Sequence, residues 1–520
     1  RVLAHTPCTK RLRPVCASST PSTRSPISLS LLLQVATRGV MLRSLAVCSL
    51  ISAHVASTDA FAVGGKLPNL ALSAPRQNVM HRSNPLSAAR MTLAEPSSES
   101  EVWKGTETLN NELLVRIDDQ WYDLSRWRRA HPAGSHWIDL YKNQDATEVM
   151  YGFHSDQGIE MIKRLPKAKA APEGVAPVSE STRNFRKWRE ELLAEGWFDR
   201  DWRHEAFNLV SWATWVTAGI MLAQFPVLGA QFGAVFVLAV ANTVAGWLAH
   251  DYVHGRGKFA DFMRPFGSFC AGMSPTWWSE KHNLHHARTN EVGKDEDIAT
   301  DPALFLWAPD PKNDAPWRKF QGMYLPLPMS MLFFLWRFDS ITTAIDRKNK
   351  GELIGLACHY AVMLSFVPPA TFIGALFLSG FMTAIITTVT HQTEDLFFDE
   401  EPEFVEGQFR STRDAECSNP FSEWLWGGMQ YQLEHHLFPT MPRYKYPALV
   451  PRVKAFAEEN NLSFRVTPEF PLLKRNVDLY HKVATLPPAP GAKGSRPEGV
   501  ARTDVTSIVA NVAVGTKTPP

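Results

Sequence analysis

Seven histidines fall into three short clusters whose spacing suits metal binding. The clusters are His250-Asp-Tyr-Val-His254, His282-Asn-Leu-His285-His286 and Gln432-Leu-Glu-His435-His436. On a helix, residues three or four apart share a face, so each cluster can direct imidazoles to one point. Neutral imidazole binds zinc, copper or iron, and single clusters do not choose among these metals. The spacing therefore predicts a metal centre but does not identify the metal.

An eighth histidine extends this set. His391 ends the last long apolar run, in Val389-Thr390-His391-Gln392. A lone histidine beside a membrane segment is more often structural, but polar groups at a membrane boundary are costly and usually mark function. Eight imidazoles exceed what one tetrahedral or octahedral metal accepts. We therefore expect two metals, held by all the clusters together.

Long apolar runs must position the clusters. Residues 206–225 and 227–249 flank Pro226, and each is near the ~20 residues needed to cross the hydrocarbon core. The turn between them has no charge, whereas basic residues follow the second run. By the positive-inside rule, that following stretch lies on the side of the N-terminal domain. These runs predict a transmembrane hairpin.

Three further apolar runs follow, at 322–338, 353–367 and 371–390. Basic residues precede the second of them, and the turn between the second and third is uncharged. This distribution favours the last two as a second hairpin and the first as interfacial. The predicted fold class is mainly α, with four spans in two hairpins over residues 204–455 and a small α+β domain before them.

The remaining regions are distinguished by composition. Residues 101–165 predict the small mixed domain, 166–184 a linker, and 456–520 a C-terminal tail that is disordered from about 486. Before Ala94 there are eleven Lys or Arg but one acidic residue, so 1–95 is predicted to be a targeting leader. Its two parts resemble a signal peptide followed by a plastid transit peptide; the alternative is a basic tail.

Charge and cysteine content exclude other classes. There are 54 Lys and Arg against 52 Asp and Glu, a net charge of +2, so no global field attracts nucleic acid. The six cysteines form no Cys-X-X-Cys pair, which indicates neither a disulfide framework nor a zinc ribbon. Function must come from local sites.

The clusters and their order resemble the membrane fatty acid desaturase family, front-end branch. Trp277-Trp278, Asp295-Glu296-Asp297 and the run from Trp426 to Pro439 carry the same resemblance over about 204–455. That branch has Gln where relatives have the first histidine of the third cluster, which implies that Gln432 lies near the metals. The resemblance implies two non-haem irons. Neighbouring carboxylates are expected to accept from ligand N–H groups, or else to be solvated charges; these are Asp251, Glu280, Glu394 and Glu434.

The N-terminal domain resembles cytochrome b5. The motifs are His131-Pro132-Ala133-Gly134, Trp121-Tyr122-Asp123-Leu124, Asp145-Ala146-Thr147 and Phe153-His154. This resemblance implies haem b with His131 and His154 as axial ligands, a carrier of electrons. Ala133 stands where the family has Gly; if that turn needs a positive φ, its Cβ would loosen the haem. The alternative is a degenerate fold without haem.

Together the resemblances imply oxygen-dependent front-end desaturation of a fatty-acyl chain, in an acyl lipid or acyl-CoA. Electrons would come from cytochrome b5 reductase or another donor through the fused haem. Sphingoid-base desaturases and lipid hydroxylases share these patterns, and a haem-bearing electron-transfer membrane protein is the non-enzyme alternative. The leader favours a plastid membrane, whereas a cytochrome b5 partner favours the endoplasmic reticulum membrane.

Overall fold

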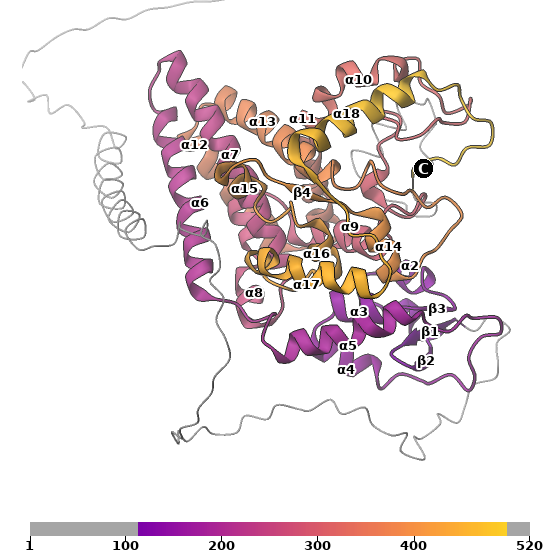
Figure 1. Cartoon of the computed structure of the whole chain (residues 1–520). Coiled ribbons are helices and arrows are strands. Elements are labelled where there is room, and N and C mark those ends of the chain that lie inside the picture. The colour runs from indigo at the N-terminus through magenta and orange to yellow at the C-terminus, as the bar shows by residue number, and fades with distance from the viewer. Residues whose placement is uncertain (1–112, 497–520) are drawn as a thin grey trace, which may run out of the picture. The chain divides into compact units, whose positions relative to one another are not determined.

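The structure is a computed structural model and describes residues 113–496. It is mainly helical, as predicted, and its described part contains two small sheets (Figure 1). The predicted leader, 1–95, lies outside the described residues, as does 497–520 of the predicted tail.

The N-terminal domain is built on a three-stranded sheet of order β2-β1-β3. β1 (Leu114–Ile117) pairs antiparallel with β2 (Gln120–Asp123) and parallel with β3 (Gln144–Asp145). Val115 and Ile117 alternate onto one face and share a core with Met150. The helices around the sheet are η1 (Trp127–Ala130), α2 (Ser135–Asp139), α3 (Thr147–Phe153) and α4 (Asp156–Ile162). This is the predicted small α+β domain.

Residues 169–178 connect this domain to the helices that follow. The last backbone bond to the sheet is Ala168 N–H to Trp121 O, at 2.9 Å. Helix α5 (Glu180–Ala194) then begins within the predicted linker, after the Ser179 side chain caps it. Its buried face packs against the segment after the third histidine cluster; that face is Phe185, Trp188 and Leu192. The connecting segment is therefore anchored at both ends.

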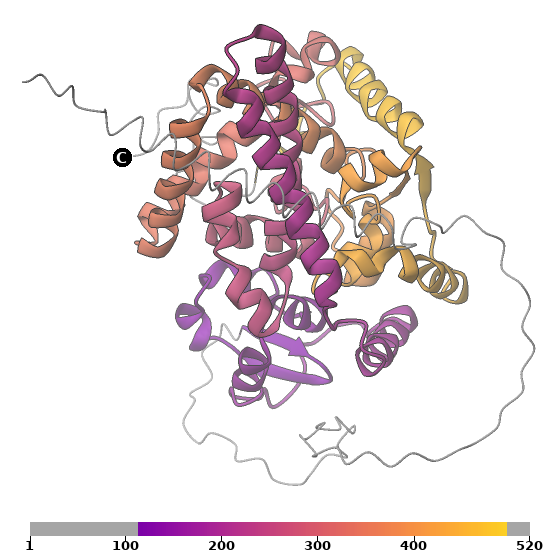
Figure 2. The same ribbon diagram turned by 90° about the vertical axis from the view of Figure 1, so that its left-hand side faces the viewer.

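Three described helices are long and apolar enough to cross a membrane: α6 (Trp202–Ala223), α7 (Leu228–His254) and α13 (Pro369–Thr388). Figures 1 and 2 show α6 and α7 side by side as the predicted first hairpin. Helix α7 extends past the predicted end at 249, because helical hydrogen bonding continues to Gly255. The first histidine cluster therefore forms the last turn of α7.

The predicted fourth span corresponds to α12 (Lys350–Phe366), which has only 17 residues. Its turn into α13 meets the turn of the first hairpin: Gln224 Nε2 donates to Phe366 O, and Thr371 Oγ1 donates to Gln231 Oε1. Helix α11 (Pro326–Asp346) covers most of the run predicted as interfacial, starting four residues after its predicted start at 322 and extending beyond its predicted end at 338. It packs along α13.

Short elements surround the ends of these helices. They are α8 (Gly257–Met263), η2 (Gly267–Ala271), α9 (Pro275–Ala287), η3 (Glu296–Ile298), η4 (Arg318–Phe320), α10 (Gln321–Tyr324), α14 (Phe404–Ser411), β4 (Asp414–Glu416), α15 (Pro420–Trp426), α16 (Gln432–Leu437), η5 (Arg443–Lys445), α17 (Tyr446–Glu459), β5 (Val466–Pro468) and α18 (Glu469–Thr485). β4 and β5 pair in parallel. Helix α18 falls in the predicted tail, yet it buries Leu472 and Tyr480.

Candidate metal centre

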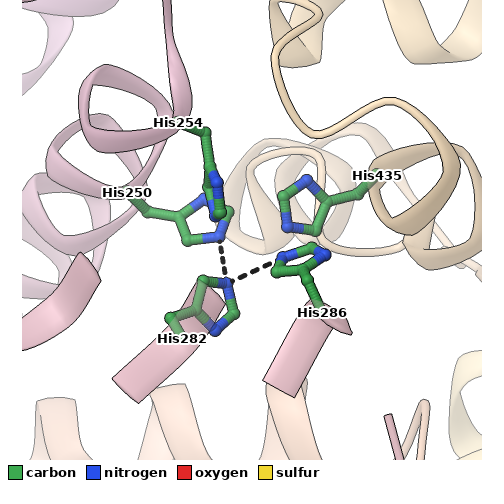
Figure 3. Close-up of side chains that lie close together, drawn as sticks. All are labelled: His250, His254, His282, His286 and His435. Atoms are coloured by element: carbon green, nitrogen blue, oxygen red, sulfur yellow. Dashed lines mark hydrogen bonds between the residues drawn. The ribbon is translucent and has the colours of Figure 1, made fainter. Parts of the chain in front are cut away.

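Five imidazoles from three helices surround one point (Figure 3). Their candidate ligand nitrogens all lie within 4.8 Å of one another; the residues are His250, His254, His282, His286 and His435. His282 Nε2 lies 2.8 Å from His250 Nε2 and 3.1 Å from His286 Nε2. Segments far apart in the sequence therefore present one nitrogen each to a common centre.

A second set adjoins the first. His285, His391 and His436 also have ligand nitrogens within 4.8 Å of one another. The rings of His286 and His436 are stacked with centroids 4.2 Å apart, so the two sets are neighbours. The structure thus brings together all eight histidines that the sequence predicts, in two groups.

Local sequence explains how α9 and α16 reach α7. Helix α9 begins with the Ser274 cap and Pro275, and the buried Glu352 accepts hydrogen bonds from Ser274 and Thr276. Before α16 the chain turns at Gly427, with φ of 60°, where a Cβ would collide with the Trp247 ring of α7. Only glycine allows both this backbone conformation and this close approach.

The outer nitrogens of four imidazoles are held by hydrogen bonds. The contacts are His285 Nδ1 to Asp295 Oδ2 (2.9 Å), His391 Nδ1 to Ser411 O (3.0 Å), His435 Nδ1 to Tyr446 OH (3.2 Å) and His436 Nδ1 to Gln408 Oε1 (2.8 Å). A partner on Nδ1 fixes the ring and directs Nε2 inward. This is the arrangement expected of histidines that bind metal through Nε2.

Several imidazole nitrogens of the two sets lack protein partners. Both nitrogens of His254, and Nε2 of His435 and His436, are buried and make no hydrogen bond within the described residues. An unpaired buried polar group is costly, so these atoms fit a metal as their partner. Burial, and then the neighbouring imidazoles, lowers the pKa of His435 and His436 well below its usual value. Both rings are therefore neutral, as metal binding requires.

The expectation for the neighbouring carboxylates was wrong, because these side chains have other partners. Asp251 pairs with Arg200, Glu280 with Arg347, and Glu394 with Arg413 and Arg465, while Glu434 faces Asp414. The carboxylate on a candidate ligand is instead Asp295, in the acidic triplet after the second cluster. Spacing along the chain could have suggested Asp295, but nothing in the sequence indicates Gln408 or Tyr446.

Gln432 lies beside the second set of imidazoles. Its Nε2 is 2.8 Å from His391 Nε2, and its Oε1 is buried without a partner. Rotation of the amide about its last bond exchanges these two atoms. The side chain can therefore present either a donor or a carbonyl oxygen at the centre.

His131 and His154 of the N-terminal domain face each other. Their ring centroids are 6.1 Å apart, and their Nδ1 atoms contact Gly134 O at 3.1 Å and Met150 O at 3.3 Å. A metal–imidazole bond is about 2 Å long, as known for zinc, so one haem iron fits between the two Nε2 atoms. Burial lowers the pKa of His154 to about 4, which keeps it neutral. In this turn the positive φ, 106°, falls on Gly134, so the concern about Ala133 was misplaced.

Comparison with known proteins identifies the families that the two domains resemble. Residues 225–468 match the fatty acid desaturase family, and residues 98–171 match the cytochrome b5-like haem/steroid binding domain. A Delta(8)-fatty-acid desaturase of Euglena gracilis is 30% identical over 387 residues, 68% of this chain and 90% of that protein. A Delta(6)-fatty-acid desaturase of Caenorhabditis elegans is 30% identical over 420 residues, 69% of this chain and 93% of that protein.

An Acyl-lipid 8-desaturase of Rebecca salina is 29% identical over 402 residues, 72% of this chain and 91% of that protein. The chain belongs to the fatty acid desaturase family. Within that family it is an oxidoreductase with a fused N-terminal cytochrome b5-like domain, which confirms the predicted front-end resemblance.

Proposed function

We propose that this protein catalyses oxygen-dependent front-end desaturation of a fatty-acyl chain: it introduces a double bond between an existing double bond and the carboxyl end. The observation that supports this most directly is the pair of adjoining, buried imidazole sets, in which several nitrogens have no hydrogen-bond partner. The reaction needs a redox-active metal, which favours iron over zinc. The eight histidines and Gln432 would hold two non-haem irons.

Bound there, two irons would supply the oxidising power needed to remove hydrogen from an unactivated methylene pair, which no side-chain acid or base can provide. The protein's own residues hold and orient this centre. Asp295, Tyr446 and Gln408 fix the outer nitrogens of three imidazoles. The site excludes water, since His286 and His436 are fully buried. The apolar faces of α6, α7 and α13 provide the environment for an acyl chain.

In the N-terminal domain, residues 101–165 would bind haem b through His131 and His154. Two imidazole ligands leave the iron without an open position, so this haem transfers electrons and does not bind dioxygen. Cytochrome b5 reductase is the proposed donor. The named Acyl-lipid relative favours an acyl lipid as substrate, with acyl-CoA as the alternative.

For the membrane we propose four spans in two hairpins within 204–455, with 456–520 following as a C-terminal segment. The contacts between the two hairpin turns support this, because both turns then lie at the end away from the histidines. Helix α12 is about 26 Å long at 1.5 Å per residue, close to the ~30 Å core. A plastid or endoplasmic reticulum membrane would hold the protein.

The test is expression in yeast fed candidate polyunsaturated acids. Wild-type protein should yield a new double bond and contain two non-haem irons per haem. His285→Ala should abolish the product, whereas His204→Ala, at an exposed histidine with 57% of its side chain accessible, should leave it unchanged. Product formation by His285→Ala would refute the metal role. An added oxygen in the product would indicate a hydroxylase, and a sphingoid product the related desaturase class.

A further inference from the structure

Helix α3, which ends at the haem ligand His154, contacts all three histidine segments. The Phe153 ring lies edge-on to the His286 ring of the second cluster, with centroids 6.4 Å apart. A Cβ on Gly152 would lie 3.7 Å from Pro439, just after the third cluster. Arg256, two residues after the first cluster, donates to backbone carbonyls of α3 and its end. One short helix is therefore packed against a ring of the second cluster and lies beside residues that follow the first and third clusters.

Arg256 joins the two sites directly. Its Nε donates to His154 O at 3.2 Å, and its Nη1 donates to His254 O at 2.8 Å. All its hydrogen bonds within the described residues go to backbone carbonyls, those of Gly152 and Gly255 included. A single guanidinium thus links the backbone of a proposed haem ligand to that of a proposed iron ligand.

The surrounding interface contains several hydrogen bonds, some of them from buried side chains. Arg288 is only 4% exposed, donates to Leu140 O and to Gln144 Oε1, and stacks over Tyr141 at 4.1 Å. Tyr141 OH donates to Ala287 O at 3.0 Å. Gln144 also donates to Glu401. Hydrogen bonds from buried side chains across a contact favour one orientation of the two domains.

We infer that this docked arrangement is the one in which electrons leave the haem, with Phe153 and Arg256 as its positioning residues. The inference rests on the proposed function. Each double bond requires two electrons from the donor and two from the acyl chain. Together with two protons from the acyl chain and two protons from the solvent, these four electrons reduce one dioxygen to two waters. Each haem oxidation passes one electron, and the reductase restores it.

The physical basis is the shortness of both connections. Phe153 is covalently adjacent to His154, and its ring contacts an imidazole of the metal centre. Arg256 offers a second connection of two hydrogen bonds through one side chain. Electron transfer slows steeply as the gap between donor and acceptor widens. Loss of either side chain should therefore slow transfer without altering the haem site itself.

The first experiment follows reoxidation of the reduced haem by stopped-flow absorbance in purified full-length holoenzyme, mixed with dioxygen and acyl substrate. Phe153→Leu and Arg256→Gln should each slow reoxidation at least tenfold, with unchanged haem content and unchanged reduction by the reductase. The matched control, Arg128→Gln on the exposed side of the N-terminal domain, should behave as wild type. Wild-type reoxidation rates in both variants, with wild-type desaturation intact, overturn the inference but not the proposed function.

The second experiment locks the domains together. Gln144→Cys with Glu401→Cys places two thiols across the interface, where the native side chains meet end to end through a hydrogen bond. A short bis-maleimide reagent should bridge the two thiols in the full chain, and the cross-linked holoenzyme should reoxidise its haem within twofold of the unreacted form. Loss of reoxidation in the cross-linked protein, or no intramolecular cross-link with reagents of increasing length, overturns the inference.

Discussion

His285 Nδ1 and Asp295 Oδ2 are 2.9 Å apart, and both side chains are fully enclosed by protein. The same carboxylate accepts from the backbone N–H groups of Asn290 and Asp297. Asp295 therefore fixes a candidate ligand to the loop after α9. Burial alone would lower the pKa of His285, but the Asp295 and Asp297 carboxylates outweigh it and raise that pKa. The pKa values of the neighbouring His286 and His436 are lowered instead.

Asp295→Asn should weaken metal binding, because one of the two accepting oxygens becomes a donor. Loss of an outer partner typically costs 10–100-fold in metal affinity. Iron content after dialysis against a chelator measures this, with desaturation as a second readout. Asp119→Asn, at a carboxylate with 89% of its side chain accessible, is the control. Wild-type iron retention in Asp295→Asn would contradict the role.

Gln432→Leu should remove metal from the set that contains His391. Leucine has a similar volume but no donor or acceptor, so the buried space stays filled while the amide is lost. Gln432→Glu keeps an oxygen and should retain more metal. The iron-to-protein ratio distinguishes them, and equal ratios in the two variants would show that Gln432 is no ligand.

Gly134→Ala should loosen the haem, whereas Ala133→Gly should not tighten it. Gly134 has φ of 106°, and a Cβ there would lie 2.8 Å from His136 Nδ1. With ψ of 160° this is a backbone region that glycine alone adopts readily, and it costs another residue about 1–3 kcal/mol. Haem content and thermal stability of the full-length protein measure the effect. The idea fails if Gly134→Ala binds haem as tightly as wild type.

Acid should release the haem. Burial, with a smaller effect of His131, lowers the pKa of His154 from 6.5 to about 4. The unfolded chain therefore binds a proton below about 6.5 that the folded chain resists. The stability that depends on neutral His154 is complete above this pH and is lost as the pH falls toward 4. Haem absorbance titrated downward from pH 7.5 should fall in this window; a band unchanged at pH 4 would contradict it.

Sequence patterns predicted what depends on local spacing. Histidines three and four apart lie on one helix face wherever that helix packs, so the three clusters could be recognised directly. The first hairpin could be predicted from the length of its two apolar runs and the uncharged turn between them. The same kind of pattern placed histidines at the end of α7 and just after α13.

Contacts between distant segments could not be read from the sequence. Gln408 and Tyr446 reach the centre only because α14 and α17 fold around α16. The carboxylates nearest in sequence to the histidines point elsewhere, because buried arginines such as Arg200 attract them. Helix α18 was missed for a similar reason, since charged residues interrupt its apolar ones and conceal a buried face that includes Leu472 and Tyr480.

The segment 169–178, anchored at both ends, keeps the haem domain on a short tether. Fully extended, it spans at most roughly 35 Å, so the effective concentration of the carrier near its acceptor is in the millimolar range. A freely diffusing carrier cannot compete at ordinary cellular levels. If the tethered haem is the carrier that we propose, overproducing a soluble carrier should leave turnover unchanged.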